Sequence, residues 1–322
     1  MHKHLPIWNL IIQSLDQHIP VTLLYVLESL GSSPGRQGFF MAVNAHGKMA
    51  GSIGGGIMEH RFVEIAKKKI TQDQNLIIRK QVHDKISGKN SSGMICSGEQ
   101  SILLYLATSD DKSAIQNIIL LLEKNRNGTL ILSPNGIKVD ETTPFKDHEF
   151  VRYSEENWCY KEKLGYKNLL SIIGGGHCSL AFSEIMRQMD FYINVYDKRP
   201  ELKTMLENNA AHEKHVIADY AELAYLIPPG RNHYVVIMTF GYRTDDIVLR
   251  ALLNKEFRYL GLLGSKAKIK KMFAAYRKEN FLEQQIQYVY TPAGIPIKSR
   301  TPEEIAISIA AEIIREKNKY LP

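Results

Sequence analysis

One stretch of the chain limits its fold more than any other: a short apolar run that leads directly into three glycines. Residues 168–173 (NLLSII) have the length and residue types of a buried strand, and glycines 174–176 follow at once. A helical pattern comes next, and a second apolar run at residues 191–196 ends at Asp197. Strand, glycines, helix, strand and acid in this order predict a Rossmann-like sheet.

The remainder of this half predicts that the sheet is doubly wound. Apolar runs at residues 215–218, 234–239 and 258–263 alternate with helical patterns. Alternating strands and helices form a parallel sheet that is covered on both faces. Two later helices are indicated by an apolar stripe that begins at Ile269 and by a capping box at residues 301–304. The predicted fold class is α/β.

The N-terminal half predicts a smaller domain of mixed α/β type. Strands are expected at residues 21–27, 39–43, 49–53, 75–82 and 101–107, and helices after glycines 54–56 and at residues 115–122. A charged and aromatic stretch separates the two halves. We therefore expect an N-terminal domain at residues 1–145, a linker at residues 146–163 and a Rossmann-like domain at residues 164–322.

The composition is that of an ordinary soluble protein, with 44% hydrophobic and 23% charged residues. No apolar run approaches the roughly 20 residues of a membrane-spanning helix, and no cleavage site follows the first apolar stretch. Three cysteines, Cys96, Cys159 and Cys178, are too few and too oddly numbered for a disulfide framework. These features predict a cytoplasmic protein with reduced thiols and no membrane insertion.

Much of the basic excess behind the net charge of +7 lies in one segment near the C-terminus. Its basic residues, among which no acid occurs, are Lys266, Lys268, Lys270, Lys271, Arg277 and Lys278. Such a patch indicates phosphate groups or an acidic partner. No nucleic-acid recognition motif accompanies it, so nucleic acid is not expected as a partner.

The glycine-rich turn at residues 174–176 is a candidate nucleotide site. Gly174 would allow the tight turn, and Gly176 would let the backbone approach a pyrophosphate at the helix N-terminus. Asp197 stands where an acid would accept a ribose hydroxyl, and Arg199 either takes a 2′-phosphate or pairs with a neighbouring acid. A bound nucleotide and a Rossmann-like fold that has drifted to another ligand both stay open.

A second glycine-rich turn, at residues 51–56, precedes a helix whose first turn contains Glu59. Its bare N–H groups and the helix dipole could hold an anion, or Glu59 could itself offset the dipole. Residues 31–35 (GSSPG) match the G-x-S-x-G nucleophile elbow in letters only, because Pro34 has no N–H to donate to an oxyanion hole. We interpret that segment as a turn.

Cys96 is the candidate functional cysteine. It follows a glycine- and serine-rich stretch and precedes a strand, which leaves a thiol reachable, although an idle or buried thiol is the alternative from the residues alone. Cys178 lies at a helix start and is interpreted as packing. His212 and His215 are three residues apart, not the four of a zinc helix motif, and are interpreted as structural.

Several segments of the chain, taken together, indicate a protein family more specifically than any one motif does. They are residues 28–35 (ESLGSSPG), 47–59 (GKMAGSIGGGIME) and Cys96-Ser97-Gly98 in the N-terminal half, and residues 174–177 (GGGH), 196–201 (YDKRPE), 260–266 (LGLLGSK) and 301–306 (TPEEIA) in the C-terminal half. Together they resemble the XdhC/CoxI family, the xanthine dehydrogenase accessory proteins.

The resemblance implies an accessory protein that binds molybdenum cofactor, assists its sulfuration and hands it to a xanthine dehydrogenase-type molybdenum hydroxylase. It implies a cysteine desulfurase-type sulfur donor as a second partner and leaves a homo-oligomer open. Cys96 is then the sulfur-relay residue or a molybdenum ligand, because a thiolate is a soft ligand. The candidate cofactor-binding residues are Gly54, Gly55, Gly56, Glu59, Gly174, Gly175, Gly176, His177, Asp197, Arg199, Ser265 and Lys266.

Two positions depart from the family pattern. Ser97 stands where the family usually has glycine, and Phe240 stands where it commonly has histidine. The alternative from another class is an NAD(P)-dependent oxidoreductase, with NAD(P) or another nucleotide in the Rossmann-like half. No histidine, lysine or tyrosine stands out in the sequence as a proton donor for such an enzyme, which favours the cofactor chaperone.

Overall fold

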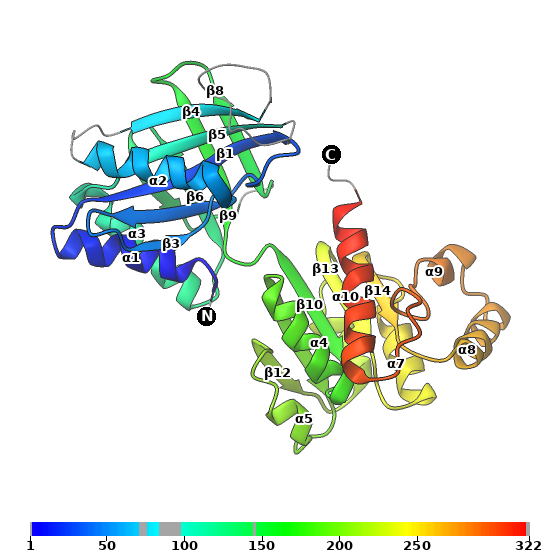
Figure 1. Ribbon diagram of the computed structural model, residues 1–322. Helices are drawn as coiled ribbons and strands as arrows, with labels where there is room; N and C mark the ends of the chain where they lie inside the picture. Colours follow the sequence, from blue (N-terminus) through cyan, green and yellow to red (C-terminus); the bar gives the residue numbers. More distant parts are fainter. Residues whose placement is uncertain (1, 71–75, 84–97, 144–145, 320–322) are drawn as a thin grey trace. The chain divides into compact units, whose positions relative to one another are not determined.

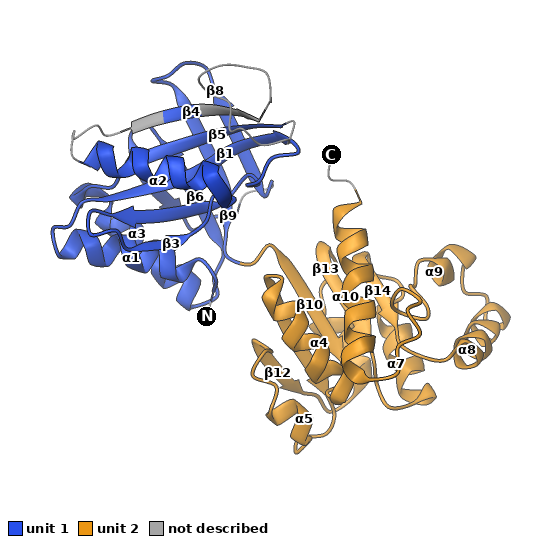
Figure 2. Ribbon diagram, viewed as in Figure 1, with its two compact units in different colours: residues 1–165 blue, residues 166–322 orange. Residues whose placement is uncertain are grey.

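The computed structural model describes residues 2–70, 76–83, 98–143 and 146–319. The chain divides into two compact units, Met1–Gly165 (unit 1) and Tyr166–Pro322 (unit 2), which Figure 2 shows in separate colours. Each unit has its own hydrophobic core. No helix in the described ranges combines the length and the hydropathy that crossing a membrane requires.

A five-stranded antiparallel sheet forms the centre of unit 1 (Figure 1). Its strands are β1 (Val21–Gly31), β2 (Phe40–Asn44), β3 (Met49–Gly51), β4 (Leu76–His83) and β5 (Gly98–Leu106), in the order β3-β2-β1-β5-β4. Successive residues of β1 face opposite sides, as the two-residue period of a strand requires. Leu24 and Val26 pack in one cluster with α2 (Gly56–Ile70), whereas Leu23 and Tyr25 belong to a larger cluster.

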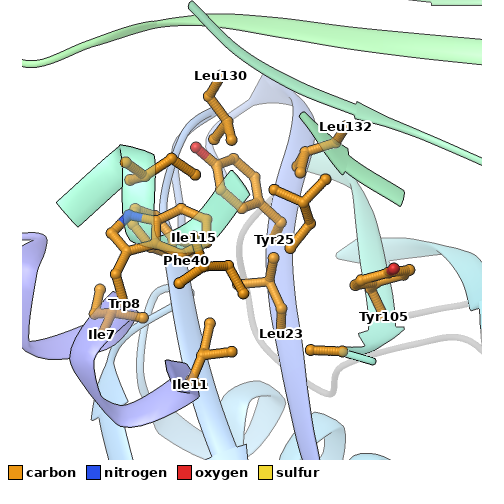
Figure 3. Close-up of a cluster of buried hydrophobic side chains, with 14 of the residues drawn as sticks. Ile7, Trp8, Ile11, Leu23, Tyr25, Phe40, Tyr105, Ile115, Leu130 and Leu132 are labelled. Atoms are coloured by element: carbon orange, nitrogen blue, oxygen red, sulfur yellow. The ribbon is translucent and has the colours of Figure 1, made fainter. Parts of the chain in front are cut away.

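A second antiparallel sheet and two helices contribute to that larger cluster. The two helices are α1 (Leu5–Asp16) and α3 (Lys112–Glu123), and the 3₁₀ helix η1 (Ser109–Asp111) precedes α3. The strands are β6 (Gly128–Ser133), β7 (Gly136–Asp140), β8 (His148–Arg152) and β9 (Trp158–Leu164), in the order β7-β6-β9-β8. Trp8 of α1, Tyr25 of β1 and Leu130 of β6 all enter the cluster (Figure 3). The ring of Phe40 links two of them, because its centroid lies 5.4 Å from that of Trp8 and 4.8 Å from that of Tyr25.

The segment that we expected to be a linker, residues 146–163, instead belongs to unit 1. It forms β8 and most of β9, and β9 also pairs with β6. Trp158 and Tyr160 are buried in the core. Glu162 is buried as well, and its carboxylate accepts hydrogen bonds from the hydroxyls of Tyr25 (2.5 Å) and Tyr160 (2.7 Å). Because Glu162 is charged although it faces inward, the sequence of β9 lacks the regular alternation of apolar and polar residues that predicts a strand.

Unit 2 is the doubly wound α/β domain that the sequence predicts. Its parallel strands are β10 (Asn168–Ile173), β11 (Phe191–Asp197), β12 (Glu213–Val216), β13 (Gly230–Ile237) and β14 (Phe257–Leu262), in the order β12-β11-β10-β13-β14. The chain therefore proceeds from β10 to β11 and β12 on one side and later to β13 and β14 on the other. In sheets of this kind, ligands bind beyond the carboxyl ends of the strands at such a switch point.

Helices cover both faces of this sheet (Figure 1). They are α4 (His177–Gln188), α5 (Lys203–Leu206), η2 (Tyr220–Glu222), α6 (Leu223–Leu226), α7 (Tyr242–Leu252), α8 (Lys266–Lys278), α9 (Glu283–Gln287) and α10 (Pro302–Asn318). Phe182 of α4 and Ile309 of α10 share one core cluster, whereas Val248 of α7 lies in the other. The predicted capping box at Thr301 and the apolar stripe of α8 that begins at Ile269 are both confirmed.

The first prediction tests the assignment of residues 146–163 to unit 1. Trp158→Ala should lower the free energy of unfolding by about 3–5 kcal/mol, because truncating a buried aromatic side chain leaves a cavity. Tyr153→Ala in the same segment should change it by less than about 0.5 kcal/mol, because Tyr153 is 79% exposed. Urea unfolding of both variants gives the measurement. Equal and small effects would mean that the segment is a linker after all.

Candidate functional site

Residues 31–35 of unit 1 touch two other glycine-containing segments through their backbones. A Cβ atom on Gly35 would lie 1.9 Å from the carbonyl oxygen of Ile53, and one on Gly54 would lie 2.4 Å from the amide nitrogen of Gly35. A Cβ atom on Gly98, at the start of β5, would lie 2.6 Å from the carbonyl oxygen of Ser32. The motifs that contain these glycines are separated along the chain, and the fold brings the other two segments against residues 31–35, an arrangement that we call the glycine junction.

The segment around Gly35 is fixed by polar side chains. The side-chain amide of Gln100 donates a hydrogen bond of 2.5 Å to the carbonyl oxygen of Gly35, and the hydroxyl of Ser33 donates one of 3.2 Å to the same oxygen. Both side chains are buried. Ser33 is therefore a structural hydroxyl, which agrees with the interpretation of residues 31–35 as a turn.

The carboxylate of Glu59 closes the second glycine-rich segment. Its Oε2 accepts hydrogen bonds from the Ser52 hydroxyl (2.6 Å) and from the backbone N–H groups of Ile53 (2.9 Å) and Gly55 (3.0 Å). Glu59 thus occupies the place that an external anion would take at the amino end of α2, and it offsets the helix dipole there. This is the second of the two alternatives that the sequence leaves open.

The last two glycines of that segment leave bare backbone exposed. Gly55 and Gly56 have φ values of +74° and +68°, a region that favours glycine. A Cβ atom on either residue would meet nothing within 4 Å. Apart from the Gly55 N–H, which donates to Glu59, the backbone of these two residues therefore borders open space.

The structure gives the surroundings of Cys178 but not those of Cys96. Cys96, the candidate functional cysteine, and Ser97 lie outside the described residues. Cys178 lies in the first turn of α4, where burial and then the nearby Glu303 carboxylate raise the pKa of its thiol. A raised pKa leaves less of the reactive thiolate at neutral pH, so this thiol suits packing better than chemistry.

In unit 2, the three glycines of the turn after β10 have different surroundings. Gly174 has a φ of +107°, and a Cβ atom there would lie 2.5 Å from the carbonyl oxygen of Met238 at the end of β13. A Cβ atom on Gly175 would lie 3.0 Å from the Cβ atom of Met205. A Cβ atom on Gly176 would meet nothing within 4 Å. Gly174 is therefore required by the fold, whereas Gly176 faces open space.

The backbone N–H groups of this turn are partly used within the protein. Gly174 donates to the carbonyl oxygen of Tyr196, and Gly175 donates to the carboxylate of Asp197 (2.8 Å). In the described part of the chain, the N–H groups of Gly176 and His177 have no acceptor, and α4 has no acid in its first turn. The amino end of this helix therefore keeps free donors of the kind that bind phosphate.

Asp197 and Arg199 form a closed pair at the end of β11. Asp197 is fully buried, and its carboxylate accepts hydrogen bonds from Nε (2.9 Å) and Nη2 (2.8 Å) of Arg199. Burial alone would raise the pKa of Asp197, but the Arg199 side chain and the Gly175 amide outweigh it, and the pKa lies below its ordinary value. Arg199 pairs with the neighbouring acid, one of the two roles that the sequence leaves open for it.

Sequence analysis missed a second buried acid at the same edge of the sheet. Asp245, in the first turn of α7, is fully buried, accepts a hydrogen bond of 2.5 Å from the Thr239 hydroxyl and forms an ion pair with Lys268. Burial raises the pKa of Asp245 in spite of these partners. An acid near the start of an amphipathic helix is ordinary in sequence, so no signal distinguished this one.

Fewer side chains of the predicted basic patch are available to a ligand than the sequence indicates, because two of them form ion pairs within the protein. Lys268 is paired with Asp245, and Arg277 with Glu283 (2.8 Å). Ser265 is the N-cap of α8, where its hydroxyl accepts a hydrogen bond from the N–H of Lys268. Lys266, Lys270 and Lys271 are exposed, with the Lys271 ammonium 5.7 Å from the ring centroid of Tyr242.

The histidines interpreted as structural do not form a metal centre. The His212 ring accepts a hydrogen bond of 2.9 Å from the N–H of Ile193 and stacks on Tyr192. His215 stacks on Tyr196. Within residues 2–70, 76–83, 98–143 and 146–319, no group of three or more His, Cys, Asp or Glu side chains is placed to hold a metal ion.

The fold and these sites define a two-unit α/β protein whose second unit is a Rossmann domain. Family models identify it further: the model of the XdhC Rossmann domain matches residues 170–313, and the model of the XdhC and CoxI family matches residues 14–79. The chain belongs to the XdhC/CoxI family.

Two curated proteins share sequence with this chain. The chain is 24% identical over 307 residues to the uncharacterized protein YqeB of Escherichia coli, covering 94% of this chain and 44% of that protein. It is 31% identical over 84 residues to a probable xanthine dehydrogenase subunit of Bacillus subtilis, covering 26% of this chain and 23% of that protein. The chain thus spans less than half the length of these curated relatives.

A solved structure shares the fold over almost the whole chain. The crystal structure of a xanthine dehydrogenase from Bacillus halodurans superposes with a TM-score of 0.70 and covers 97% of this chain and 96% of that one. The two sequences are 23% identical, a level at which the likeness shows the fold.

The second prediction separates the two outer glycines of the turn after β10. Gly174→Ser should lower the free energy of unfolding by about 2–3 kcal/mol or more, because serine is strained at positive φ and its Cβ would collide with the carbonyl of Met238. Gly176→Ser should change it by less than about 0.5 kcal/mol, because serine is at least as good an N-cap as glycine and its side chain has room. Thermal or urea unfolding checks both values. A stable Gly174→Ser variant would contradict the geometry described for this turn.

Proposed function

We propose that this protein is an accessory protein that binds molybdenum cofactor and assists its sulfuration and its insertion into a xanthine dehydrogenase-type molybdenum hydroxylase. Family membership supports the class of protein, and the Bacillus subtilis relative, a probable subunit of xanthine dehydrogenase, supports the client. The proposed second partner is a cysteine desulfurase-type sulfur donor, and the proposed location is the cytoplasm. The cofactor is cargo, not a resident prosthetic group.

The observation that carries the proposal is the glycine junction of unit 1. It joins the described parts of three separate family motifs, at Gly35, at Gly54 and at Gly98. Beside it, a ligand would meet no Cβ atom at Gly55 or Gly56, so a flat polar ring can approach the backbone of Gly56 and the carbonyl group of Gly55 closely, whereas the Gly55 N–H donates to Glu59. A pterin ring has this shape and needs such partners. Backbone without side chains is therefore a better match for a pterin ring than for a bulky apolar ligand.

The phosphate of the cofactor has a separate candidate site in unit 2. The N–H groups of Gly176 and His177 at the amino end of α4 supply donors for an anion, and the 12-residue length of the helix gives it a full dipole. We propose these groups, and not the start of α2, for the phosphate, because Glu59 already fills the start of α2.

Cys96 is the proposed contact with molybdenum or sulfur. A thiolate is a softer ligand than the hydroxyls of Ser32 and Ser33 in the neighbouring motif, so it is the better match for a molybdenum–sulfur centre or a persulfide. A persulfide on Cys96 would require sulfur from the desulfurase-type donor. This role is proposed from the chemistry of the residue and from the family resemblance.

The third prediction tests Cys96 in a host that expresses a xanthine dehydrogenase-type hydroxylase. Cys96→Ala should lower the activity of that hydroxylase per enzyme molecule by about tenfold or more, because no soft ligand or sulfur carrier remains. Cys159→Ala and Cys178→Ala serve as matched controls and should keep the activity within about twofold, since the pKa of the Cys178 thiol is raised by burial.

Molybdenum and pterin analysis of the purified protein accompanies this assay. Pterin bound to the parent and to Cys96→Ala, with a poorly activated hydroxylase only for the variant, would assign the thiol to sulfuration or transfer. Full activation by Cys96→Ala would remove the thiol from the mechanism. A nicotinamide in place of a pterin in the parent would favour the NAD(P)-dependent oxidoreductase instead.

A further inference from the structure

The carboxylate of Asp197 has no capacity left for a ligand. In dinucleotide-binding sheets, the acid at the end of the second strand accepts a hydrogen bond from a ribose hydroxyl. Here Oδ1 accepts from N (3.0 Å) and Nε (2.9 Å) of Arg199, and Oδ2 accepts from Nη2 of Arg199 (2.8 Å) and from the Gly175 N–H (2.8 Å). A carboxylate offers about four acceptor positions, and all four are taken. Asp197 is also fully buried, so a ribose cannot reach it.

The group that faces solvent at this position is a donor instead. A guanidinium has five N–H bonds, of which Arg199 uses one on Nε and one on Nη2 for Asp197. The other three, both of Nη1 and one of Nη2, have no acceptor within the described chain, and the side chain is 43% exposed. The buried carboxylate holds the guanidinium plane in one orientation. Arg199 therefore presents these three N–H donors in a fixed orientation at the end of β11, and we call them the donor fork.

The guanidinium of Arg199 lies over the ring of Phe240. The ring follows β13, is 74% exposed, and has its centroid 5.0 Å from the guanidinium carbon. Because β10 lies between β11 and β13, this contact spans the end of β10, where the turn of glycines 174–176 begins. The donor fork, an exposed aromatic face and the free N–H groups of Gly176 and His177 therefore belong to one edge of the sheet.

We infer that the carboxyl edge of the sheet in unit 2 selects ligands that carry a phosphomonoester and discriminates against the same ligands with a free hydroxyl in its place, with Arg199 as the specificity-determining residue. A phosphomonoester dianion presents acceptor oxygens only, which match the remaining N–H bonds of Arg199. A ribose diol needs an acceptor, and Asp197 supplies none. The inference deepens the proposed function and rests on it only in taking this edge as a ligand site.

Two kinds of molecule carry this chemistry, and matched pairs distinguish them. NADP⁺ differs from NAD⁺ by one 2′-phosphomonoester, and neopterin monophosphate differs from neopterin by one terminal phosphomonoester. The dissociation constants of all four compounds are measured by calorimetry with the full-length protein. We expect the phosphorylated member of at least one pair to bind about tenfold or more tightly than its partner, with a preference that weakens as salt is raised. The preferred pair identifies the source of the phosphate.

Arg199→Gln should reduce that preference to about twofold or less, because glutamine carries no positive charge and offers fewer donors. Because this variant leaves the buried Asp197 without its partner, the double variant Asp197→Asn/Arg199→Gln, which removes both charges, is measured beside it. Arg231→Gln is the matched control: Arg231 is exposed near the amino end of β13, so its loss removes the same charge from the opposite edge of the sheet.

Three outcomes would overturn the inference. The first is equal affinity within both pairs in the parent protein, the second is a preference that survives in both Arg199 variants, and the third is no measurable binding of any of the four compounds at millimolar concentration. Hydroxylase activation is scored separately with the Cys96 variants. A protein that activates its client but shows no phosphomonoester preference would keep the proposed function and lose this inference.

Discussion

Both units depend on one constraint: backbone passes backbone at distances that a side chain would not permit. In unit 1, Gly35 lies against Ile53, and in unit 2, Gly174 lies against Met238. A methyl group at either position would stand within 2.5 Å of a carbonyl oxygen. The glycine-rich motifs are therefore first a packing requirement. Only positions where a Cβ atom would meet open space, such as Gly56 and Gly176, leave backbone available to a ligand.

This constraint also bears on which elements of the fold could be predicted from the sequence. The strands of unit 2, the capping box at Thr301 and the buried stripe of α8 were predictable, because local periodicity and capping chemistry determine them. The strand β9 was not, because its inward residue Glu162 is charged and becomes acceptable only when the hydroxyls of Tyr25 and Tyr160 meet it. Tyr25 is 137 residues away from Glu162 along the chain, beyond any local pattern.

The same limit applies to the candidate sites. The sequence placed Asp197 at the right point of a Rossmann-like pattern, but it did not show that Arg199 and Gly175 would fill its carboxylate. It left two alternatives open before α2, an external anion or Glu59, and only the structure shows that Glu59 accepts from the N–H groups there. In both cases the spacing gave the position of an acid, and only the side-chain geometry showed that the acid serves its own protein.

Buried acids organise the carboxyl edge of unit 2 in a common way. Asp197 and Asp245 are both fully buried, and each holds a partly exposed cation, Arg199 and Lys268 respectively. Removing a carboxylate from water is costly unless a cation and hydrogen bonds compensate it, so each acid requires its partner to stay in place. A ligand at this edge therefore meets positive charge and not the negative charge of the acids. The two buried acids fix the positions of Arg199 and Lys268, and this edge therefore presents the outer sides of two cations.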